Sequence, residues 1–239
     1  PMLLAEAERD DALAAFRAGA IYEEGCGVRP NRQAAAVYYE KAAKLGHVDA
    51  RVRLGILYVE GEAVEADPAK ARSLLDEPAA KGHPLASYHL GVMAWRGDGT
   101  QPPTPDREAA MRHFQAAAAN GLAQAQFIVG QALVQGAELP RDLKAGAAML
   151  DRAARQGNVW SMVVLGRLHA ERELAGADAG VALNWLTIAR EASPDDAMLQ
   201  ASVALSLQRL DGRLTAAQRR QALAQARAFA PEPEWEEKF

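Results

Sequence analysis

Cysteine, aromatic residues and long apolar runs are scarce in this chain of 239 residues, and each scarcity excludes a class of protein. Cys26 is the one cysteine, so no disulfide can form within the chain, and the redox compartment stays open. No apolar stretch approaches the roughly 20 residues that a membrane-spanning helix needs. Aromatic residues make up 6% while alanine is abundant, and this combination favours closely packed helices over a sandwich or barrel.

A basic excess is also missing, because 27 Lys and Arg face 31 Asp and Glu and the formal net charge is −4. Proteins that bind nucleic acid normally carry a basic excess on the binding face. We therefore expect no nucleic-acid partner. No signal peptide is visible, although one could have been removed upstream of Pro1.

Catalytic motifs are absent from the sequence as well. It contains no Gly-x-Ser-x-Gly elbow, no phosphate-binding Gly-x-x-x-x-Gly-Lys, no Cys-x-x-Cys and no His-Glu-x-x-His. None of the six serines is followed by Lys three residues later, so a serine–lysine site is excluded. His47 and His83 each follow a glycine at the same place in a repeat, which indicates a role at helix ends. We expect no enzyme, no cofactor and no metal site.

What the chain does contain is a repeat of about 36 residues, most complete from Ala50 to Gly82. In this copy a small residue, Gly55, follows Leu54. An Ala or Ser stands five residues before this small residue in each copy, and a glycine stands six residues after it in most copies. The fifth copy has Arg172 in place of that glycine, which predicts a longer first helix there. The counterparts of the small residue are Gly19, Gly55, Gly91, Gly130, Gly166 and Ser206.

The second half of each copy keeps the same register. A closing small residue recurs at Gly46, Gly82, Gly121, Gly157, Ser193 and Ala230. Fifteen positions earlier stand residues that commonly cap helix N-termini: Asn31, Asp67, Asp106, Asp142, Asp178 and Thr215. Seven positions before each closing residue stands a large apolar side chain: Tyr39, Leu75, Phe114, Leu150, Leu186 and Leu223.

Each copy therefore reads as a helix, a turn at glycine, a capped second helix and a glycine C-terminus. We predict an all-α protein, a right-handed α-α superhelix (solenoid) of about six helix-turn-helix repeats and about twelve helices, in a single solenoid domain spanning 1–239. A C-terminal tail, 231–239, follows the last helix. The predicted repeats span about 14–46, 50–82, 86–121, 125–157, 161–193 and 201–230.

The pattern Ala-x-x-x-Leu-Gly-x-x-Tyr-x-x-Gly, Asp-x-x-Lys-Ala and Lys-Ala-Ala-x-x-Gly resembles the Sel1-like repeat, a relative of the tetratricopeptide repeat. Residues 50–82 carry it nearly completely, 161–193 lose the turn glycine, and 201–230 are degenerate. The resemblance implies a bacterial protein–protein interaction module that binds its partner through a concave face lined by the first helix of each repeat.

Several functions agree with this resemblance. One is an immunity protein that inhibits a lipase effector of a type VI secretion system. Another is an envelope or polysaccharide-secretion scaffold, and a weak hydrolase or β-lactam-binding protein is the alternative from a different class. We expect the partner to be another protein, an effector or an envelope component, and the chain to be a monomer apart from it. Localisation stays open, with the bacterial periplasm favoured over the cytoplasm.

The positions that vary among repeats are the candidates for binding. Three of them, spaced i, i+4 and i+7, form one stripe on each first helix, which is either core or a partner groove with aromatic anchors. Arg17, Arg53 and His89 lie beside this stripe, and they indicate either an acidic partner segment or solvated ion pairs within and between repeats. Trp160 is expected in the link before the first helix of the fifth copy. The predicted partner-binding residues are Arg53, Tyr88, His89, Val92, Trp95, Arg96, Phe127, Gln131, Trp160 and Arg167.

Two irregular segments have no assigned role. The loop 97–106 is three residues longer than its equivalents, and its three prolines and two glycines predict an exposed connector without regular structure. The acidic tail carries Trp235, which either folds back over the last helix or docks on a partner.

Overall fold

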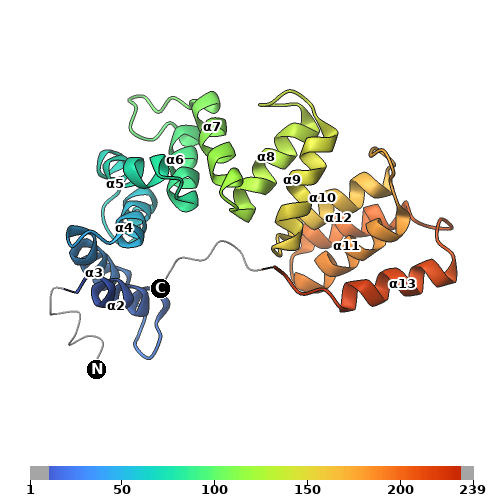
Figure 1. Cartoon of the computed structure of the whole chain (residues 1–239), viewed down its shortest axis with the longest axis horizontal. Helices are drawn as coiled ribbons and strands as arrows, with labels where there is room; N and C mark the ends of the chain where they lie inside the picture. The colour runs from blue at the N-terminus through green and yellow to red at the C-terminus, as the bar shows by residue number, and fades with distance from the viewer. Residues whose placement is uncertain (1–10, 233–239) are drawn as a thin grey trace. The chain divides into compact units, whose positions relative to one another are not determined.

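The computed structural model describes residues 11–232, and within this range the chain is entirely helical (Figure 1). Twelve helices and no strand occupy the described residues, which confirms the all-α class and the expected number of helices. The helices are α2 (Ala12–Glu24), α3 (Arg32–Lys44), α4 (Val48–Glu60), α5 (Pro68–Ala80), α6 (Pro84–Arg96), α7 (Arg107–Ala119), α8 (Ala123–Gln135), α9 (Leu143–Arg155), α10 (Val159–Ala170), α11 (Ala179–Ala192), α12 (Ala197–Gln208) and α13 (Ala216–Arg227).

The helices gather into two compact units. Helices α2 to α7 form the N-terminal unit, which ends at Asn120, and α8 to α13 form the C-terminal unit, which begins at Gly121. Within the first, α2 packs on α3, α4 on α5 and α6 on α7. Within the second, α8 packs on α9 and α10 on α11. Each of these pairs is one helix-turn-helix repeat.

The predicted caps of the second helices are all confirmed. Each of the six side chains accepts a hydrogen bond from a backbone N–H of the first helical turn, as in Asp67, whose Oδ1 lies 3.0 Å from the Lys70 nitrogen. The expectation for the two histidines is also met. His47 and His83 begin α4 and α6, and their Nδ1 atoms accept from backbone nitrogens three residues later. Local sequence therefore determines where these helices begin.

The central glycines admit the large apolar side chain of the second helix in the same repeat. A Cβ built on Gly19 would lie 2.5 Å from a ring carbon of Tyr39, and one on Gly166 would lie 2.5 Å from Cγ of Leu186. Real Cβ atoms do not come so close to other atoms, so only glycine permits this contact. The small residue and the large apolar residue that recur in each copy of the sequence therefore contact one another in the structure.

The turn of the fifth repeat differs from the prediction. Helix α10 ends at Ala170 and is not extended, because Arg172 itself adopts a left-handed conformation with φ 60°. Its N–H donates to the carbonyl of His169, and the N–H of Glu173 donates to that of Leu168. These bonds close the helix as glycine does in the other repeats. Among the described residues Arg172 is the one non-glycine with positive φ.

The register expected for the sixth repeat does not describe its packing. With Ser206 as the central small residue, Leu205 would correspond to Leu54 and be buried. Leu205 is instead 58% exposed, whereas Leu54 is 5% exposed. Val203 and Ser206 face the core of the C-terminal unit in its place.

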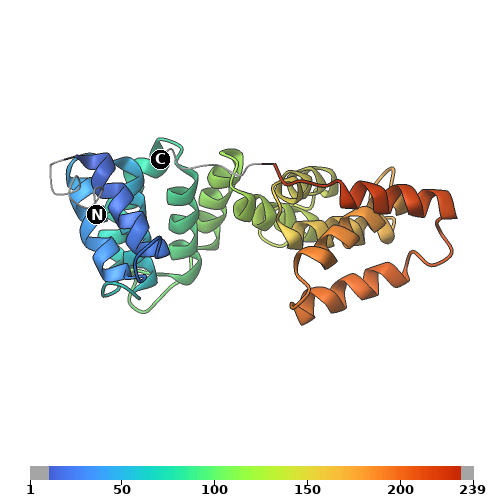
Figure 2. The same cartoon turned by 90° about the horizontal axis from the view of Figure 1, so that it is seen from below.

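Helix capping shows the correct alignment. Asp196 caps α12 eight positions before Ala204, just as His47 caps α4 eight positions before Gly55. The counterpart of the central glycine is therefore Ala204, two residues earlier than expected. No side chain closes over it, because α13 packs against α11 and lies apart from α12 (Figure 2). Ala204 instead lines a groove of about 470 Å³ between α11, α12 and α13.

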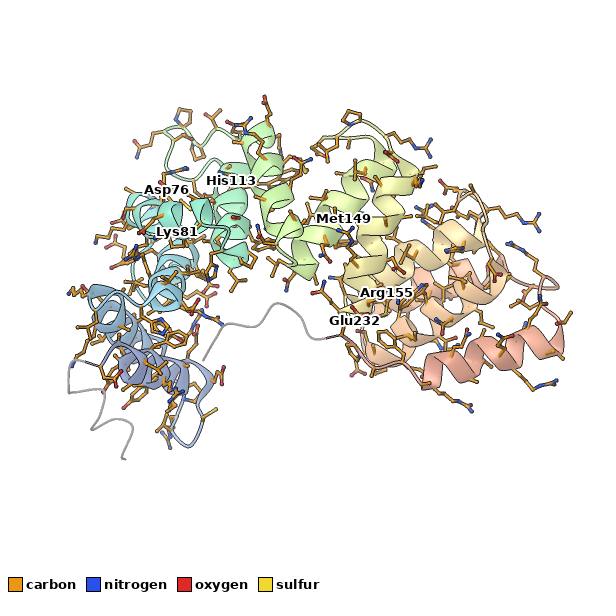
Figure 3. The ribbon with its side chains drawn as sticks, in the orientation of Figure 1. Asp76, Lys81, His113, Met149, Arg155 and Glu232 are labelled. Carbon is orange, nitrogen blue, oxygen red and sulfur yellow. The ribbon has the colours of Figure 1, made fainter. Side chains whose placement is uncertain are left out.

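The structure describes all of the loop 97–106 but only the first two residues of the tail 231–239. The loop 97–106 is an exposed connector, as expected, and the Thr100 hydroxyl donates to the Gly97 carbonyl while accepting from the Thr104 nitrogen. After α13 the chain returns to the end of α9, where the N–H of Glu232 donates to the carbonyl of Arg155 at 2.8 Å (Figure 3). Trp235 and the other residues of 233–239 lie outside the described residues, so the expectations for Trp235 stay predictions.

Candidate partner-binding site

The ten predicted partner-binding residues fall in both units. Phe127, Gln131, Trp160 and Arg167 lie on α8 and α10 of the C-terminal unit. The other six lie on α4 and α6 of the N-terminal unit, and we call them the α4–α6 face. The α4–α6 face consists of Arg53, Tyr88, His89, Val92, Trp95 and Arg96.

The apolar stripe is core on α4 and half-exposed on α6. Val52 and Ile56 are 0% and 7% exposed and pack in a cluster with residues of α5 and α6. Their counterparts on α6, Tyr88 and Val92, are only half-buried, and so is Trp95 at the end of the stripe. The interpretation of the stripe as core therefore holds for Val52 and Ile56 of α4, whereas Val59 and the stripe residues of α6 are only partly buried.

The two aromatic side chains of α6 are held in place by α7. The ring centroids of Tyr88 and Phe114 are 5.6 Å apart, and those of Trp95 and Phe114 are 6.4 Å apart. The guanidinium carbon of Arg107 lies 3.4 Å from the centroid of the Trp95 ring. Such aromatic and cation–π contacts restrict both rings to one orientation.

Two arginines of this face, Arg53 and Arg96, act electrostatically on His89. Burial, followed by the positive charges of Arg53 and Arg96, lowers the pKa of His89 to about 4. Its Nδ1 atom is buried and has no hydrogen-bond partner in the structure. His89 is therefore neutral at physiological pH, and the positive charge of the face comes from Arg53 and Arg96.

Asp49, whose pKa the positive charge of Arg53 helps to lower, is bonded to His83. Asp49 accepts a hydrogen bond from Nε2 of His83 at 3.0 Å, and this bond, ahead of the nearby charges, holds the pKa of Asp49 below its usual range. Arg96 is exposed and lines a small cavity of about 120 Å³ together with Tyr58. The exposed guanidinium group of the face is therefore that of Arg96.

Several charged residues that the repeat leaves variable are paired within the chain. Arg51 forms an ion pair with Glu77. Arg167, a predicted partner-binding residue, pairs with Glu171 at 2.7 Å and with Glu173 at 2.9 Å. A partner that used Arg167 would have to compete with two carboxylates, which makes this residue a weaker anchor than Arg96.

Trp160 lies elsewhere than expected. It stands in the first turn of α10 and not in the link before it, because Asn158 caps that helix through the Ser161 nitrogen. Trp160 and Phe127 are half-buried and pack against the core of the C-terminal unit. Both therefore contribute to packing, and their exposed edges are all that a partner could reach.

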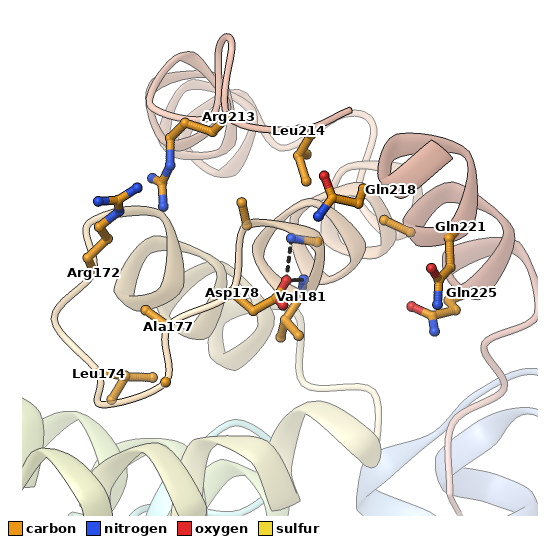
Figure 4. A pocket seen from close by; sticks show the side chains of 14 residues that line it. Arg172, Leu174, Ala177, Asp178, Val181, Arg213, Leu214, Gln218, Gln221 and Gln225 are labelled. Carbon is orange, nitrogen blue, oxygen red and sulfur yellow. Dashed lines mark hydrogen bonds between the residues drawn. The ribbon is translucent and has the colours of Figure 1, made fainter. Parts of the chain in front are cut away.

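The structure also contains a cavity that the sequence pattern did not reveal. It has a volume of about 700 Å³ and lies between the turn that joins α10 to α11 and one side of α13 (Figure 4). Arg172 and Arg213 line one end, and polar side chains of α13 line another wall. The one signal in the sequence was Arg172 at a position where the other repeats have glycine.

Chemistry based on a metal centre has no candidate site in residues 11–232, since no group of three or more His, Cys, Asp or Glu side chains converges there. Cys26 is exposed, and the neighbouring Glu24 raises the pKa of its thiol, mainly by accepting a hydrogen bond from it, which disfavours the reactive thiolate. No helix in this range has the length and apolarity needed to cross a membrane.

Comparison with known families identifies the class of protein. The family model described as Sel1 repeat matches four consecutive segments, 12–47, 48–83, 84–122 and 123–158, which together cover more than half of the chain. The chain belongs to the Sel1 repeat family, and its repeats form a protein-interaction module. A search of curated proteins found no match.

Solved structures share the fold at low sequence identity. A Sel1 repeat protein from Oxalobacter formigenes aligns with a TM-score of 0.72 and 22% identity over 92% of this chain and 88% of its own. The protective antigen c5321 of uropathogenic Escherichia coli, which displays an SLR fold, aligns with a TM-score of 0.56 and 22% identity over 95% of this chain. This chain spans 55% of that antigen.

A third solved structure carries a functional description. The immunity protein Pa5087 from Pseudomonas aeruginosa aligns with a TM-score of 0.53 and 22% identity, over 91% of this chain and 81% of its own. At this identity the likeness shows a common fold.

Proposed function

We propose that this protein is an immunity protein that binds one effector protein through the α4–α6 face and blocks its activity, with a lipase effector of a type VI secretion system as the first candidate. The observation that carries the proposal is the pair of half-buried rings, Tyr88 and Trp95, held on Phe114 and Arg107. The fold shared with the immunity protein Pa5087 supports this class of partner.

Tyr88 and Trp95 have the properties of interface anchors. Binding hot spots are enriched in Tyr, Trp and Arg, and side chains that are already ordered lose little conformational entropy when a partner binds. Trp95 is ordered by Arg107 and Phe114 before any partner arrives. A partner pocket that covers both rings therefore gains apolar burial at low entropic cost.

Charge gives the face its preference among partners. Arg96 is exposed on the same helix as both rings, and His89 adds no charge at neutral pH. An effector with carboxylates around an apolar pocket would complement this arrangement, and such complementarity mainly raises the association rate and the specificity. We therefore expect binding to slow as the salt concentration rises.

The experiment is a capture followed by reconstitution. The tagged wild-type chain and the Trp95→Ala variant are used to capture proteins from the native host, and quantitative mass spectrometry identifies proteins enriched only by the wild type. The best candidate is then purified and mixed with the chain, and light scattering and a lipase assay measure stoichiometry and inhibition. We expect a one-to-one complex and loss of the effector's activity.

Matched variants localise the interface. Tyr88→Ala and Trp95→Ala should each weaken the complex by about 2 kcal/mol or more, as hot-spot residues do. Val37→Ala is the control, because Val37 is a large apolar side chain on α3 that is 65% exposed and lies outside the α4–α6 face. Binding that survives both aromatic substitutions would place the interface elsewhere, and a partner that is captured but not inhibited would support a scaffold instead.

A further inference from the structure

We propose that the 700 Å³ cavity of the C-terminal unit is a second binding site, separate from the α4–α6 face, which takes an extended acidic peptide segment of a protein partner. The site is formed by Arg172 and Arg213 together with three glutamines of α13. The site recognises two features of the ligand, its carboxylates and its peptide groups.

The side chains of Arg172 and Arg213 line one end of the cavity. Figure 4 shows the side chains of Arg172 and Arg213 pointing toward one another. Arg213 donates from one Nη to the carbonyls of Ala170 and Arg209, and its buried Nε has no hydrogen-bond partner. Neither arginine forms an ion pair with any carboxylate in the described residues.

Three carboxylates beside the turn of the fifth repeat are bonded to other groups. Glu171 and Glu173 pair with Arg167, and Asp178, which lines the cavity, accepts from the backbone nitrogens of Gly180 and Val181. Two like charges held together without a counter-ion repel one another, and an anion placed between them removes that repulsion. The arginine end therefore favours a carboxylate, which guanidinium can bind through two hydrogen bonds.

The glutamines of α13 add a second kind of recognition. Gln218, Gln221 and Gln225 follow one side of the helix and line the cavity wall (Figure 4). The side-chain Oε1 of Gln218 accepts hydrogen bonds from Thr215, which leaves its amide hydrogens available. The side chains of Gln221 and Gln225 make no hydrogen bond within residues 11–232. A carboxamide can donate and accept at once, so it matches a peptide group better than a phosphate, which only accepts.

The spacing of these glutamines suits an extended chain. Gln218 and Gln225 are seven residues apart, or about 10.5 Å along the helix axis. An extended peptide advances about 3.3 Å per residue, so about three of its residues lie alongside the glutamines. The cavity volume is within the range of about 300–1,000 Å³ that is usual for ligand sites.

The backbone at Arg172 supports a role for its side chain. The equivalent position is glycine in the first four repeats, where φ is positive, and a non-glycine residue is less favourable than glycine in that conformation. Arg172 adopts this less favourable conformation, and its guanidinium group is thereby placed at the cavity. A purely structural turn would be served better by glycine.

The test measures peptide binding by fluorescence polarisation of the full chain. The probe is a fluorescein-labelled hexapeptide of glutamates, and the comparison peptides are the same length in glutamine and in N-methylated glutamate. The site reads charge and backbone together, so we expect the glutamate peptide to bind and each comparison peptide to bind at least about tenfold more weakly.

Variants separate this site from general charge attraction. Arg172→Gly restores the usual turn residue and should fold at least as well as the wild type, yet weaken peptide binding about tenfold. Gln221→Ala combined with Gln225→Ala should weaken it about as much. Arg220→Gln is the matched control, because it removes one positive charge from an exposed residue of α13 that does not line the cavity.

Three outcomes would overturn the proposal. The first is no binding of the glutamate peptide by the wild type. The second is an equal loss in Arg172→Gly and Arg220→Gln, which would mean attraction by net charge alone. The third is binding to vesicles of anionic phospholipid that depends on Arg172 while the glutamate peptide does not compete. None of these results depends on the α4–α6 face, so the two proposals can fail separately.

Discussion

The guanidinium carbon of Arg107 lies 3.4 Å from the centroid of the Trp95 ring, which joins the first turn of α7 to the last turn of α6. Replacing Arg107 with alanine should therefore release Trp95 as well as remove a contact. We expect Arg107→Ala to lower the free energy of unfolding by about 1 kcal/mol, measured by urea denaturation. Arg112→Ala is the control, since Arg112 pairs only with the exposed Glu108. Equal effects of the two would mean that the contact contributes nothing.

The close approach of Gly166 to Leu186 gives a second prediction. A methyl group at Gly166 would overlap the Leu186 side chain, so Gly166→Ala should destabilise the protein by about 1–3 kcal/mol. Adding Leu186→Ala removes the overlapping atoms, and the combined loss should be smaller than the sum of the two single losses. Thermal unfolding followed by circular dichroism measures all three variants. Additive losses would contradict the proposed contact.

The shifted register of α12 is tested by comparing two leucines. Leu165 on α10 is buried, so Leu165→Ala should cost about 2–5 kcal/mol. Leu205 would share that environment if Ser206 were the central small residue, but it is exposed, and Leu205→Ala should change stability by less than about 0.5 kcal/mol. Urea denaturation of the two variants distinguishes the alignments, and similar losses would restore the one centred on Ser206.

His89 makes stability depend on pH. Its pKa is about 4 in the folded chain, below the ordinary value of 6.5, so the unfolded chain binds the proton more readily. The stabilising effect of a neutral His89 is therefore complete above pH 6.5 and is lost as the pH falls toward 4. Lowering the pH from 7 to 5 should cost about 2 kcal/mol through this residue.

His89→Gln isolates that contribution. The pKa values of His47, His113 and His169 are also lowered by burial, so the wild type loses stability in acid through several groups. The His89→Gln variant keeps those and loses only the contribution of His89. Urea denaturation at pH 7 and pH 5 should give a smaller difference for the variant than for the wild type, and an identical difference would show that His89 is protonated equally in both states.

Arg172 gives a prediction about stability alone. Because its φ is 60°, Arg172→Gly should raise the free energy of unfolding by up to about 1 kcal/mol, measured by thermal denaturation. The control is Arg190→Gly, which introduces the same residue within α11 and should destabilise that helix by about 1 kcal/mol. A loss of stability in Arg172→Gly would mean that its side chain holds the turn together.

Repetition made most of the architecture predictable. Most copies of the pattern contain a cap residue, a turn glycine, a small residue and a large apolar residue at the same positions. The roles of Asp67 as a cap, Gly55 as the small residue and Leu75 as the large residue could therefore be predicted from the sequence. The predictions were wrong in the fifth and sixth repeats, where the sequence departs from the repeat pattern. Nothing near Arg172 showed that a non-glycine would take the left-handed turn, and in the sixth repeat an apolar helix with small residues at both 204 and 206 allowed two registers.

The sequence alone determined the positions of the helices and the identity of the framework, because caps and turns depend on neighbours within a few residues. Only the tertiary structure decided which variable residues are available to a partner. Val52 and Tyr88 hold the same place in the pattern, yet one is buried and the other half-exposed, because burial depends on which helix packs against that face. The cavity beside α13 likewise exists only because that helix packs on α11, which no local pattern encodes.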